Sequence, residues 1–388
     1  MQNPSANTPG LVSKLPRVGT TIFTVMSRLA AEYNAVNLGQ GFPDFPCSDE
    51  LIDLITKAMK AGHNQYAPME GVMALREQIA LKSERLYGST PDPVSEITVT
   101  SGGTEALYAA IAAVIHPGDE AIVLEPCYDS YIPAIELNGG KAIRIALTPG
   151  TYQVDWAQVK EHIVPHTKLL IINTPHNPTG TVLTEADVHQ LAEMLKDTDI
   201  FLISDEVYEH LIYDNQIHQS VLREPSLRER AFVIYSFGKT YHATGWKVGY
   251  CIAPPVLTSA FRKVHQYLTF STFTPVQHAL AQYLQQPEHY LSLPQFYGQK
   301  RDYFRQLMGQ TRFQMLPCQG SYFALASYTH ISDESDADFA IRLTKEAGVT
   351  AVPVSVFYQD RTDHKVLRFC FAKTAETLER AVEHLLKI

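Results

Sequence analysis

The 388-residue sequence has few cysteines and lacks the spacing that cysteine-based sites need. The cysteines are scattered, odd in number and without a CxxC pair, and they are Cys47, Cys127, Cys251, Cys318 and Cys370. This pattern argues against both a disulfide framework and a zinc site. It favours the cytoplasm as the compartment.

The chain also lacks an excess of basic residues and any long apolar run. It has 32 Lys and Arg against 41 Asp and Glu, and the net charge of -9 disfavours a nucleic-acid partner. The longest apolar run, residues 106–115, is too short to cross a bilayer, and the first twenty residues lack a signal peptide's apolar stretch. We expect a soluble globular protein with no membrane partner.

Strand and helix patterns alternate between about residues 97 and 253. The short β-branched runs are "ITVT", "AIVL", "AIRIAL", "KLLIIN", "IFLISDE", "FVIYSF" and "VGYCIA". Segments such as "ALYAAIAAVI" and "EADVHQLAEML" separate them and have a helical pattern. This alternation is typical of βα units around a mostly parallel sheet, so we predict an α/β fold.

The pattern changes after about residue 289. A long helical pattern runs from about Tyr290 to Gly309, and the short strands "SYFALA" and "VLRFCFA" follow, with a helix near residues 337–347 between them. This pattern fits a smaller α+β domain. We predict an N-terminal arm with part of the small domain at residues 1–45, a large domain at 46–289 and a C-terminal small domain at 290–388.

Three polar residues follow consecutive predicted strands. Asn177, Asp205 and Lys239 come just beyond "KLLIIN", "FLIS" and "VIYSF". Open parallel sheets bind ligands at the carboxyl ends of their strands, so we expect an amide, a carboxylate and an amine in one cleft. Pyridoxal phosphate needs a lysine for its aldehyde, a carboxylate beside its ring nitrogen and donors at its phenolate, for which Asn177 and Tyr208 are candidates.

Lys239, Asp205 and Asn177 each have an alternative interpretation. Lys239 lies in a Gly-Lys-Thr string, but a phosphate-binding P-loop would need glycine where Val233 stands. Asp205 could cap a helix, although its apolar context makes an unpaired carboxylate costly. Asn177 can form a turn in "HNPTG", and that turn could also aim its amide at a ligand.

The segments "NTPHNPTG", "SDEVYEHL", "SFGKTYHATGWKVGY" and "LRFCFAK" together resemble the class I aminotransferases. The resemblance runs from about Lys14 to the C-terminus. It implies fold type I among pyridoxal-phosphate enzymes, with a large mostly parallel-sheet domain and a smaller α+β domain. The segments "VNLGQGFPDFP", "NQYAPMEG" and "AVPVSVFY" are similar to the branch of glutamine (kynurenine) transaminases and bacterial methionine aminotransferases.

The resemblance implies an aminotransferase with pyridoxal 5'-phosphate as its cofactor. An L-amino acid of the methionine, glutamine or aromatic type would pass its amino group to a 2-oxo acid by a ping-pong mechanism, with Lys239, Asp205 and Tyr208 as catalytic residues. A cysteine-conjugate β-lyase on the same scaffold is the alternative. A DNA-binding regulator with this fold would need an added helix-turn-helix domain, for which the N-terminal arm is too short.

The resemblance also implies how the cofactor is held. Gly103 and Thr104 start a helix after a strand, where backbone amides bind phosphate. Ser236 and Lys247 complete the phosphate site, and Tyr66 would reach in from a second subunit, so we expect a homodimer. Lys247 stands where the family commonly has arginine, which keeps the charge and loses the planar fork.

Other residues are expected around the cofactor ring and the substrate. Tyr128 matches the residue that stacks on the ring, and Tyr131 is expected to be only its neighbour. Arg368 lies on an apolar strand, where arginine is costly unless it meets an anion such as the substrate α-carboxylate. The remaining candidates are Gly41 and Asn177 beside that carboxylate, Phe23, Phe357 and Tyr358 as side-chain pocket or core, and His176 and His242 as structural histidines without a metal.

Overall fold

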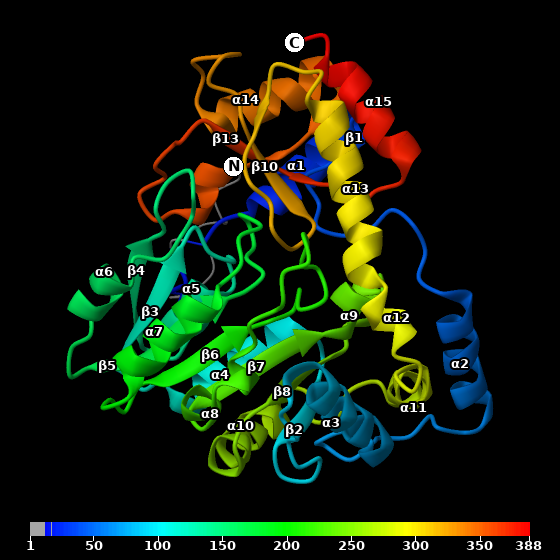
Figure 1. Ribbon diagram of the computed structural model, residues 1–388, viewed down its shortest axis with the longest axis vertical. Helices are drawn as coiled ribbons and strands as arrows, with labels where there is room; N and C mark the ends of the chain where they lie inside the picture. Colours follow the sequence, from blue (N-terminus) through cyan, green and yellow to red (C-terminus); the bar gives the residue numbers. More distant parts are fainter. Residues whose placement is uncertain (1–11, 17) are drawn as a thin grey trace.

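The computed structural model describes residues 12–16 and 18–388, so the predicted arm at 1–45 lies partly outside the described residues. The described chain has a larger lower half and a smaller upper half in the view of Figure 1. A seven-stranded sheet lies in the lower half, and a four-stranded sheet lies in the upper half.

Seven strands of the described chain form the larger sheet in the spatial order β2-β8-β7-β6-β5-β3-β4. They are β2 (Ile97–Thr100), β3 (Glu120–Glu125), β4 (Lys141–Ala146), β5 (Thr167–Asn173), β6 (Phe201–Asp205), β7 (Ala231–Ser236) and β8 (Gly249–Ile252). β8 is antiparallel to both neighbours, and the other neighbouring pairs are parallel. The prediction of a mostly parallel α/β sheet is confirmed.

The central strands are apolar along their whole length because both faces of the sheet are covered. Ile171 and Ile203 belong to one apolar core with residues of α4 and α10. Leu170 and Leu202 belong to a second core that includes residues of α3 and α7. Successive strand residues point to opposite faces, so each strand contributes to both cores.

Helices of the lower half cover this sheet, and several of their starts follow from the sequence. Thr184 and Asp187 form a capping box at the start of α7. Gly102 adopts φ 84° just before α4, a conformation that favours glycine. The helices are α2 (Asp49–Lys60), α3 (Met73–Tyr87), α4 (Gly103–Val114), α5 (Tyr131–Leu137), α6 (Trp156–Glu161), α7 (Glu185–Leu195), α8 (Pro225–Arg228), α9 (Phe237–Thr240), α10 (Pro255–Leu268), α11 (Thr274–Tyr283) and α12 (Glu288–Leu291), with short 3-10 turns η1 (Val221–Arg223) and η2 (Thr244–Trp246).

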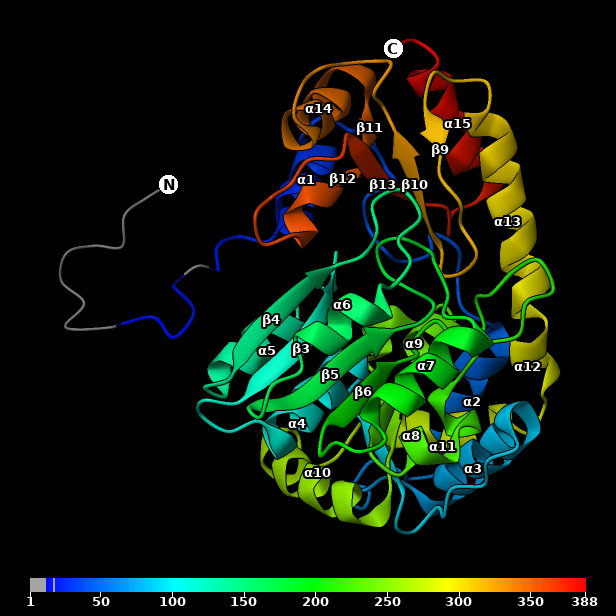
Figure 2. The ribbon, with the colours of Figure 1, turned by 60° about the vertical axis from the view of Figure 1, so that its left-hand side comes forward.

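The upper half combines segments from both ends of the chain (Figure 2). β1 (Val36–Asn37) pairs in parallel with β11 (Val349–Thr350). The four-stranded antiparallel sheet has the order β12-β13-β10-β9. Its strands are β9 (Gln314–Met315), β10 (Phe323–Ser327), β12 (Val352–Pro353) and β13 (Val366–Cys370).

The helices of the upper half are α1 (Ile22–Glu32), α13 (Leu293–Met308), α14 (Asp336–Arg342) and α15 (Ala375–Leu385), with a 3-10 turn η4 (Val354–Phe357). The helix expected near residues 337–347 is α14 followed by a π-helical segment, η3 (Leu343–Ala347). α13 runs along one side of the molecule from the lower half to the upper half (Figures 1 and 2).

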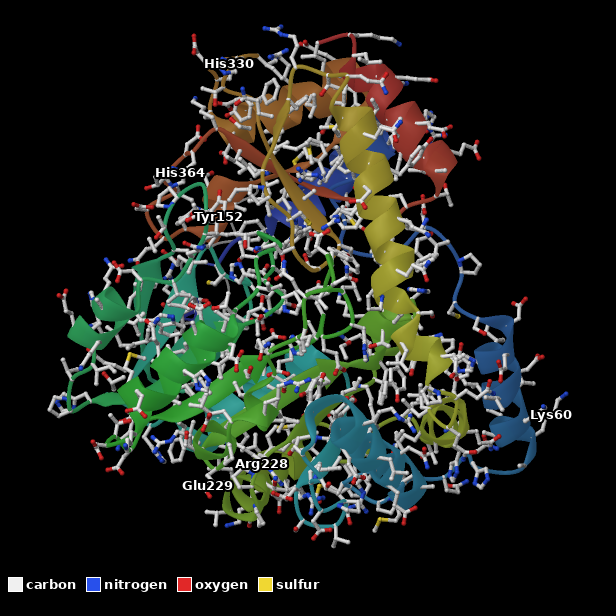
Figure 3. All side chains as sticks on the ribbon, viewed as in Figure 1. Lys60, Tyr152, Arg228, Glu229, His330 and His364 are labelled. Atoms are coloured by element: carbon white, nitrogen blue, oxygen red, sulfur yellow. The ribbon has the colours of Figure 1, made fainter. Side chains whose placement is uncertain are left out.

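Side chains fill the space between the two halves (Figure 3). Tyr152, which is labelled there, lies on the loop that connects β4 to α6, at the level where the halves meet. None of the helices in the described part of the chain has the length and apolar character needed to cross a membrane.

Candidate active site

One pocket of about 240 Å³ lies at the carboxyl ends of the central strands. Asn177, Asp205 and Lys239 come from the ends of β5, β6 and β7, which are neighbours in the sheet. The predicted site residues that line this pocket are Phe23, Gly41, Gly103, Thr104, Tyr128, Asn177, Asp205, Tyr208, Ser236, Lys239, Lys247 and Arg368. The predicted convergence of strand ends is therefore present.

Asp205 is a buried carboxylate at the bottom of this site, with 3% of its surface exposed. Its Oδ2 accepts a 2.6 Å hydrogen bond from the Tyr131 hydroxyl, and its Oδ1 accepts a 3.3 Å bond from the backbone N–H of Val207. Burial raises the pKa of Asp205 to about 6, although both hydrogen bonds act in the opposite direction. The expectation that Tyr131 is only a neighbour is wrong, because its hydroxyl directly contacts the carboxylate.

Asn177 is oriented by two neighbours. Its backbone N–H donates to Oδ1 of Asn173 at 2.8 Å, while the Asn173 amide donates to the backbone oxygen of Asp205 at 2.8 Å. The side-chain oxygen of Asn177 accepts a 2.8 Å bond from Nη1 of Arg368. Because this oxygen is committed to Arg368, the donor that Asn177 can offer the pocket is Nδ2.

Arg368 is almost fully buried, with 1% of its surface exposed. Its guanidinium lies 3.9 Å from the ring centre of Phe323 and also near Phe23 and Phe357, at 5.1 and 5.4 Å. Nη2 donates to the backbone oxygen of Gly39 at 3.0 Å, but the buried Nε has no partner in the described part of the chain. A buried unpaired donor on a cation is costly, so this group fits an anionic ligand.

Lys239 lies on α9, which directly follows β7. Its Nζ donates to the Tyr322 hydroxyl at 2.9 Å and to the backbone oxygen of Gly41 at 3.2 Å. Burial lowers the pKa of Lys239 to about 8, since a charged amine loses solvation there. With this pKa, roughly a tenth of the lysine amine is uncharged at pH 7, far more than for an ordinary lysine, and a nucleophile or base must be uncharged.

The start of α4 forms a backbone cradle. Gly102 is the residue before the helix, Gly103 is its first residue, and the Thr104 hydroxyl lies 3.2 Å from the Tyr128 hydroxyl. The nearby backbone is tightly packed, because a Cβ at Gly249 would lie 2.5 Å from the oxygen of Tyr235 and 3.1 Å from the nitrogen of Gly103. The N–H groups of the first helical turn have no partner within the helix, and Ser236 and Lys247 line the same pocket, so this end of α4 is suited to a phosphate.

Tyr66 does not line this pocket with the other predicted residues. Its surface is 81% exposed, and its ring packs edge-on against Phe270 at 5.3 Å. The prediction places Tyr66 in the pocket of a second subunit, so its position on an exposed face is compatible with that role.

The two predicted structural histidines have contacts of their own. Nδ1 of His176 lies 2.7 Å from the Thr179 hydroxyl, and burial lowers the pKa of His176 to about 3. Nδ1 of His242 lies 2.9 Å from the Tyr297 hydroxyl. These rings are held by internal hydrogen bonds.

The sequence reasoning missed Tyr322 as well as the role of Tyr131. Tyr322 is fully buried and lies in the run "SYFALA", whose pattern predicts a strand. A tyrosine in such a run usually fills core space with a satisfied hydroxyl, and nothing local signals contact with a lysine 83 residues away.

Comparison with known proteins identifies the family. Residues 33–385 match the family model of aminotransferase class I and II. The chain belongs to this aminotransferase family. Among curated relatives, methionine aminotransferase of Escherichia coli strain K12 is 54% identical over 374 residues, which cover 96% of this chain and 97% of that protein.

Two further relatives of this aminotransferase support the assignment. Kynurenine–oxoglutarate transaminase 1 of Mus musculus is 34% identical over 389 residues, which cover 91% of this chain and 92% of that protein. The solved structure of YbdL from Escherichia coli, which its authors describe as having a methionine aminotransferase function, has a TM-score of 0.96 at 53% identity and covers 97% of this chain and 99% of that one. The aminotransferase therefore has the type I fold of pyridoxal-phosphate enzymes.

The pocket of the aminotransferase fits pyridoxal phosphate, the cofactor of this family. The buried Asp205 carboxylate has no ion-pair partner within 4 Å among the described residues, and a protonated ring nitrogen would supply one. The cradle at α4 suits the phosphate, and Lys239 offers the amine. The protein is a pyridoxal-phosphate-dependent enzyme that moves amino groups between amino acids and 2-oxo acids.

Proposed function

We propose that this aminotransferase prefers amino acids with large uncharged side chains, of the methionine, glutamine or aromatic type. The charged residues that line its pocket are Asp205, Lys239, Lys247 and Arg368. Each is already matched to the cofactor or to the substrate α-carboxylate. None of the charged lining residues in the described chain is left to pair with a second charge, which an acidic substrate would bring.

The aromatic residues near Arg368 support the same substrate class. Phe23 lines the pocket, and its ring centre lies 5.9 Å from that of Phe357. Polarisable side chains such as a thioether or an aromatic ring pack favourably against such rings. Relatives named for methionine and kynurenine at 54% and 34% identity favour this class as well.

We assign two tasks to Lys239. When bound, pyridoxal phosphate supplies an aldehyde that condenses with amines and a ring that accepts electron density from the substrate α-carbon. Lys239 would be the amine that holds the aldehyde before a substrate amine takes its place. Its freed amine then moves a proton between the substrate α-carbon and the cofactor carbon, a base role that a pKa of about 8 suits.

The other residues hold and tune the ring. We assign the Asp205 carboxylate to the ring nitrogen, where it keeps that nitrogen protonated, and the Tyr208 hydroxyl and the Asn177 amide to the phenolic oxygen. Tyr128, which lines the pocket, would pack against the ring. Arg368 binds the substrate α-carboxylate, with its unpaired Nε as one donor and the loop at Gly41 beside it.

The phosphate site and the dimer belong together in this proposal. Gly103, Thr104, Ser236 and Lys247 hold the phosphate, and Tyr66 of the second subunit completes the site. Tyr66 packs against Phe270, and two aromatic residues close to Phe270 in the sequence are also exposed, Tyr267 at 90% and Phe273 at 55%. Large exposed aromatic groups of this kind favour a contact with a second copy of the chain.

We also propose the domain division at residues 1–45, 46–289 and 290–388, and a cytoplasmic location. The separation of the seven-stranded and four-stranded sheets supports that division. The five cysteines form no disulfide, which agrees with a reducing compartment.

Steady-state assays across a panel of amino acids and 2-oxo acids test the substrate class. We expect kcat/KM for methionine, glutamine and phenylalanine to exceed that for aspartate by about tenfold or more, because an uncompensated charge is costly to bury. Equal or higher values for aspartate would contradict the proposal. Release of pyruvate and thiol from cysteine conjugates at rates above transamination would instead favour the β-lyase alternative.

A further inference from the structure

We propose that Tyr322 is a positioning residue, whose hydroxyl forms, with the Gly41 carbonyl, a seat for the Lys239 amine when that amine is not bonded to the cofactor. The inference rests on the proposed role of Lys239. It adds a residue to the reaction that neither the strand ends nor the sequence motifs indicate.

The seat is defined by three hydrogen bonds. Nζ of Lys239 donates to the Tyr322 hydroxyl at 2.9 Å and to the Gly41 oxygen at 3.2 Å. The Tyr322 hydroxyl in turn donates to the same Gly41 oxygen. The single hydroxyl proton is thus used on Gly41, and an oxygen lone pair remains to accept from the amine.

This arrangement orients an uncharged amine. A neutral lysine amine has two N–H donors and one lone pair. When Tyr322 and Gly41 accept both N–H groups, the lone pair is the only part of the amine left to face the pocket. A lone pair held in this direction is what the amine needs to take a proton or to attack a carbonyl carbon.

Packing makes the seat rigid. Tyr322 is fully buried, and its ring packs edge-on against Tyr208 at 5.1 Å and Phe323 at 5.0 Å. A Cβ at residue 41 would lie 2.6 Å from Cζ of Phe323. Glycine therefore lets the residue 41 carbonyl come within hydrogen-bonding distance of the Lys239 amine. The family resemblance implies that the backbone of Gly41 lies beside the substrate carboxylate, and we assign its carbonyl this second role.

The seat joins the two halves of the molecule. Gly41 follows β1 and Tyr322 precedes β10, both in the upper half, whereas Lys239 lies on α9 at the end of the large sheet. The position of the free amine therefore depends on how the upper half sits over the pocket. A core tyrosine without this role would affect folding but not the amine.

Tyr322→Phe tests the seat, because phenylalanine keeps the ring and removes only the hydroxyl. Tyr328→Phe is the matched control, since Tyr328 is also fully buried but its hydroxyl donates to the backbone oxygen of Glu334. The first readout uses enzyme stripped of cofactor and measures the rate at which it captures added pyridoxal phosphate, by the change in absorbance. We expect about a tenfold slower capture in Tyr322→Phe and no change in Tyr328→Phe.

The second readout is proton transfer in the loaded enzyme. We expect Tyr322→Phe to lower kcat about tenfold with little change in KM, and to increase the isotope effect of an α-deuterated substrate. In a Lys239→Ala background without any added amine, no amine occupies the seat, so Tyr322→Phe should have no further effect on the residual rate. An equal loss in that background would show that Tyr322 acts on something other than Lys239 and would overturn the proposal.

Borohydride labelling distinguishes an error in the proposed seat from an error in the proposed role of Lys239. If borohydride fixes the cofactor to Lys239 in both wild type and Tyr322→Phe, but capture and isotope effect do not change, the seat alone is wrong. If the cofactor is fixed to another residue in wild type, the role of Lys239 is wrong and the seat falls with it.

Discussion

The Tyr131 hydroxyl donates a 2.6 Å hydrogen bond to the Asp205 carboxylate. The bond lowers the pKa of Asp205, while burial raises it, so Tyr131 helps to keep the carboxylate ionised. An ionised Asp205 is what a protonated ring nitrogen requires as its partner.

Tyr131→Phe should therefore weaken the pairing of Asp205 with the cofactor. A hydrogen bond to a charged group is worth about 2 kcal/mol, so we expect a roughly 30-fold loss in cofactor affinity or in kcat. Equilibrium dialysis with pyridoxal phosphate and steady-state kinetics measure the two quantities. Unchanged values for both would mean that the ionisation of Asp205 does not depend on Tyr131.

Asp205→Asn should stabilise the enzyme that has been stripped of cofactor. The folded-state pKa of about 6 lies above the ordinary value of 3.8, so the carboxyl contributes most to stability below pH 3.8. That contribution is lost as the pH rises through about 6, because the unfolded chain then ionises the group more readily. Asparagine avoids this cost, and we expect a gain on the order of 2 to 3 kcal/mol at about pH 7.5.

Urea unfolding of the stripped enzymes across pH measures this difference. The gain should shrink as the pH falls from 6 and vanish below 3.8, where Asp205 is protonated in both the folded and the unfolded chain. A stability gain that is the same at all pH values would contradict the electrostatic explanation. The same variant should lose nearly all turnover, since an amide does not hold a proton on the ring nitrogen.

Arg368→Lys keeps a positive charge and removes the planar fork. A lysine at this position has no counterpart to Nε, and it does not span both Asn177 and a carboxylate in the same way. We expect kcat/KM for amino acids to fall roughly 10²- to 10³-fold, with cofactor binding unchanged. Substrate titrations followed by cofactor absorbance separate the two effects, and a loss of cofactor would contradict the assignment.

Mixed dimers test the proposed role of Tyr66. Lys239→Ala and Tyr66→Ala chains are each expected to have little activity alone. When the two are unfolded together and refolded as a mixture, half of the dimers pair different chains, and one of the two sites in these has both wild-type residues. We expect about one quarter of wild-type activity in the mixture. No recovery would mean that Tyr66 does not complete the site of a partner subunit.

The sequence could predict the pocket because parallel topology brings strand ends together. Once β5, β6 and β7 are recognised, Asn177, Asp205 and Lys239 must follow neighbouring strand ends. Arg368 could be found because a cation on an apolar strand needs an anion. These inferences depend only on local pattern and on the register of adjacent strands.

The sequence could not predict contacts made by residues far apart in the chain. Tyr131 reaches Asp205 across 74 positions, and Tyr322 reaches Lys239 across 83. Tyr131 begins α5 after Asp129 and Ser130, and Tyr322 lies in an apolar run. For both tyrosines a core role is the ordinary expectation, and only tertiary packing decides where their hydroxyls point.

The central claim is that Lys239 carries the cofactor. Borohydride reduction of the loaded enzyme, followed by peptide mapping, tests it most directly. The account predicts one pyridoxyl group per chain, attached to the peptide that contains Lys239. It also predicts that the Lys239→Ala enzyme folds but carries no pyridoxyl group at a specific residue. A pyridoxyl group on any other lysine in the wild-type enzyme would contradict the account.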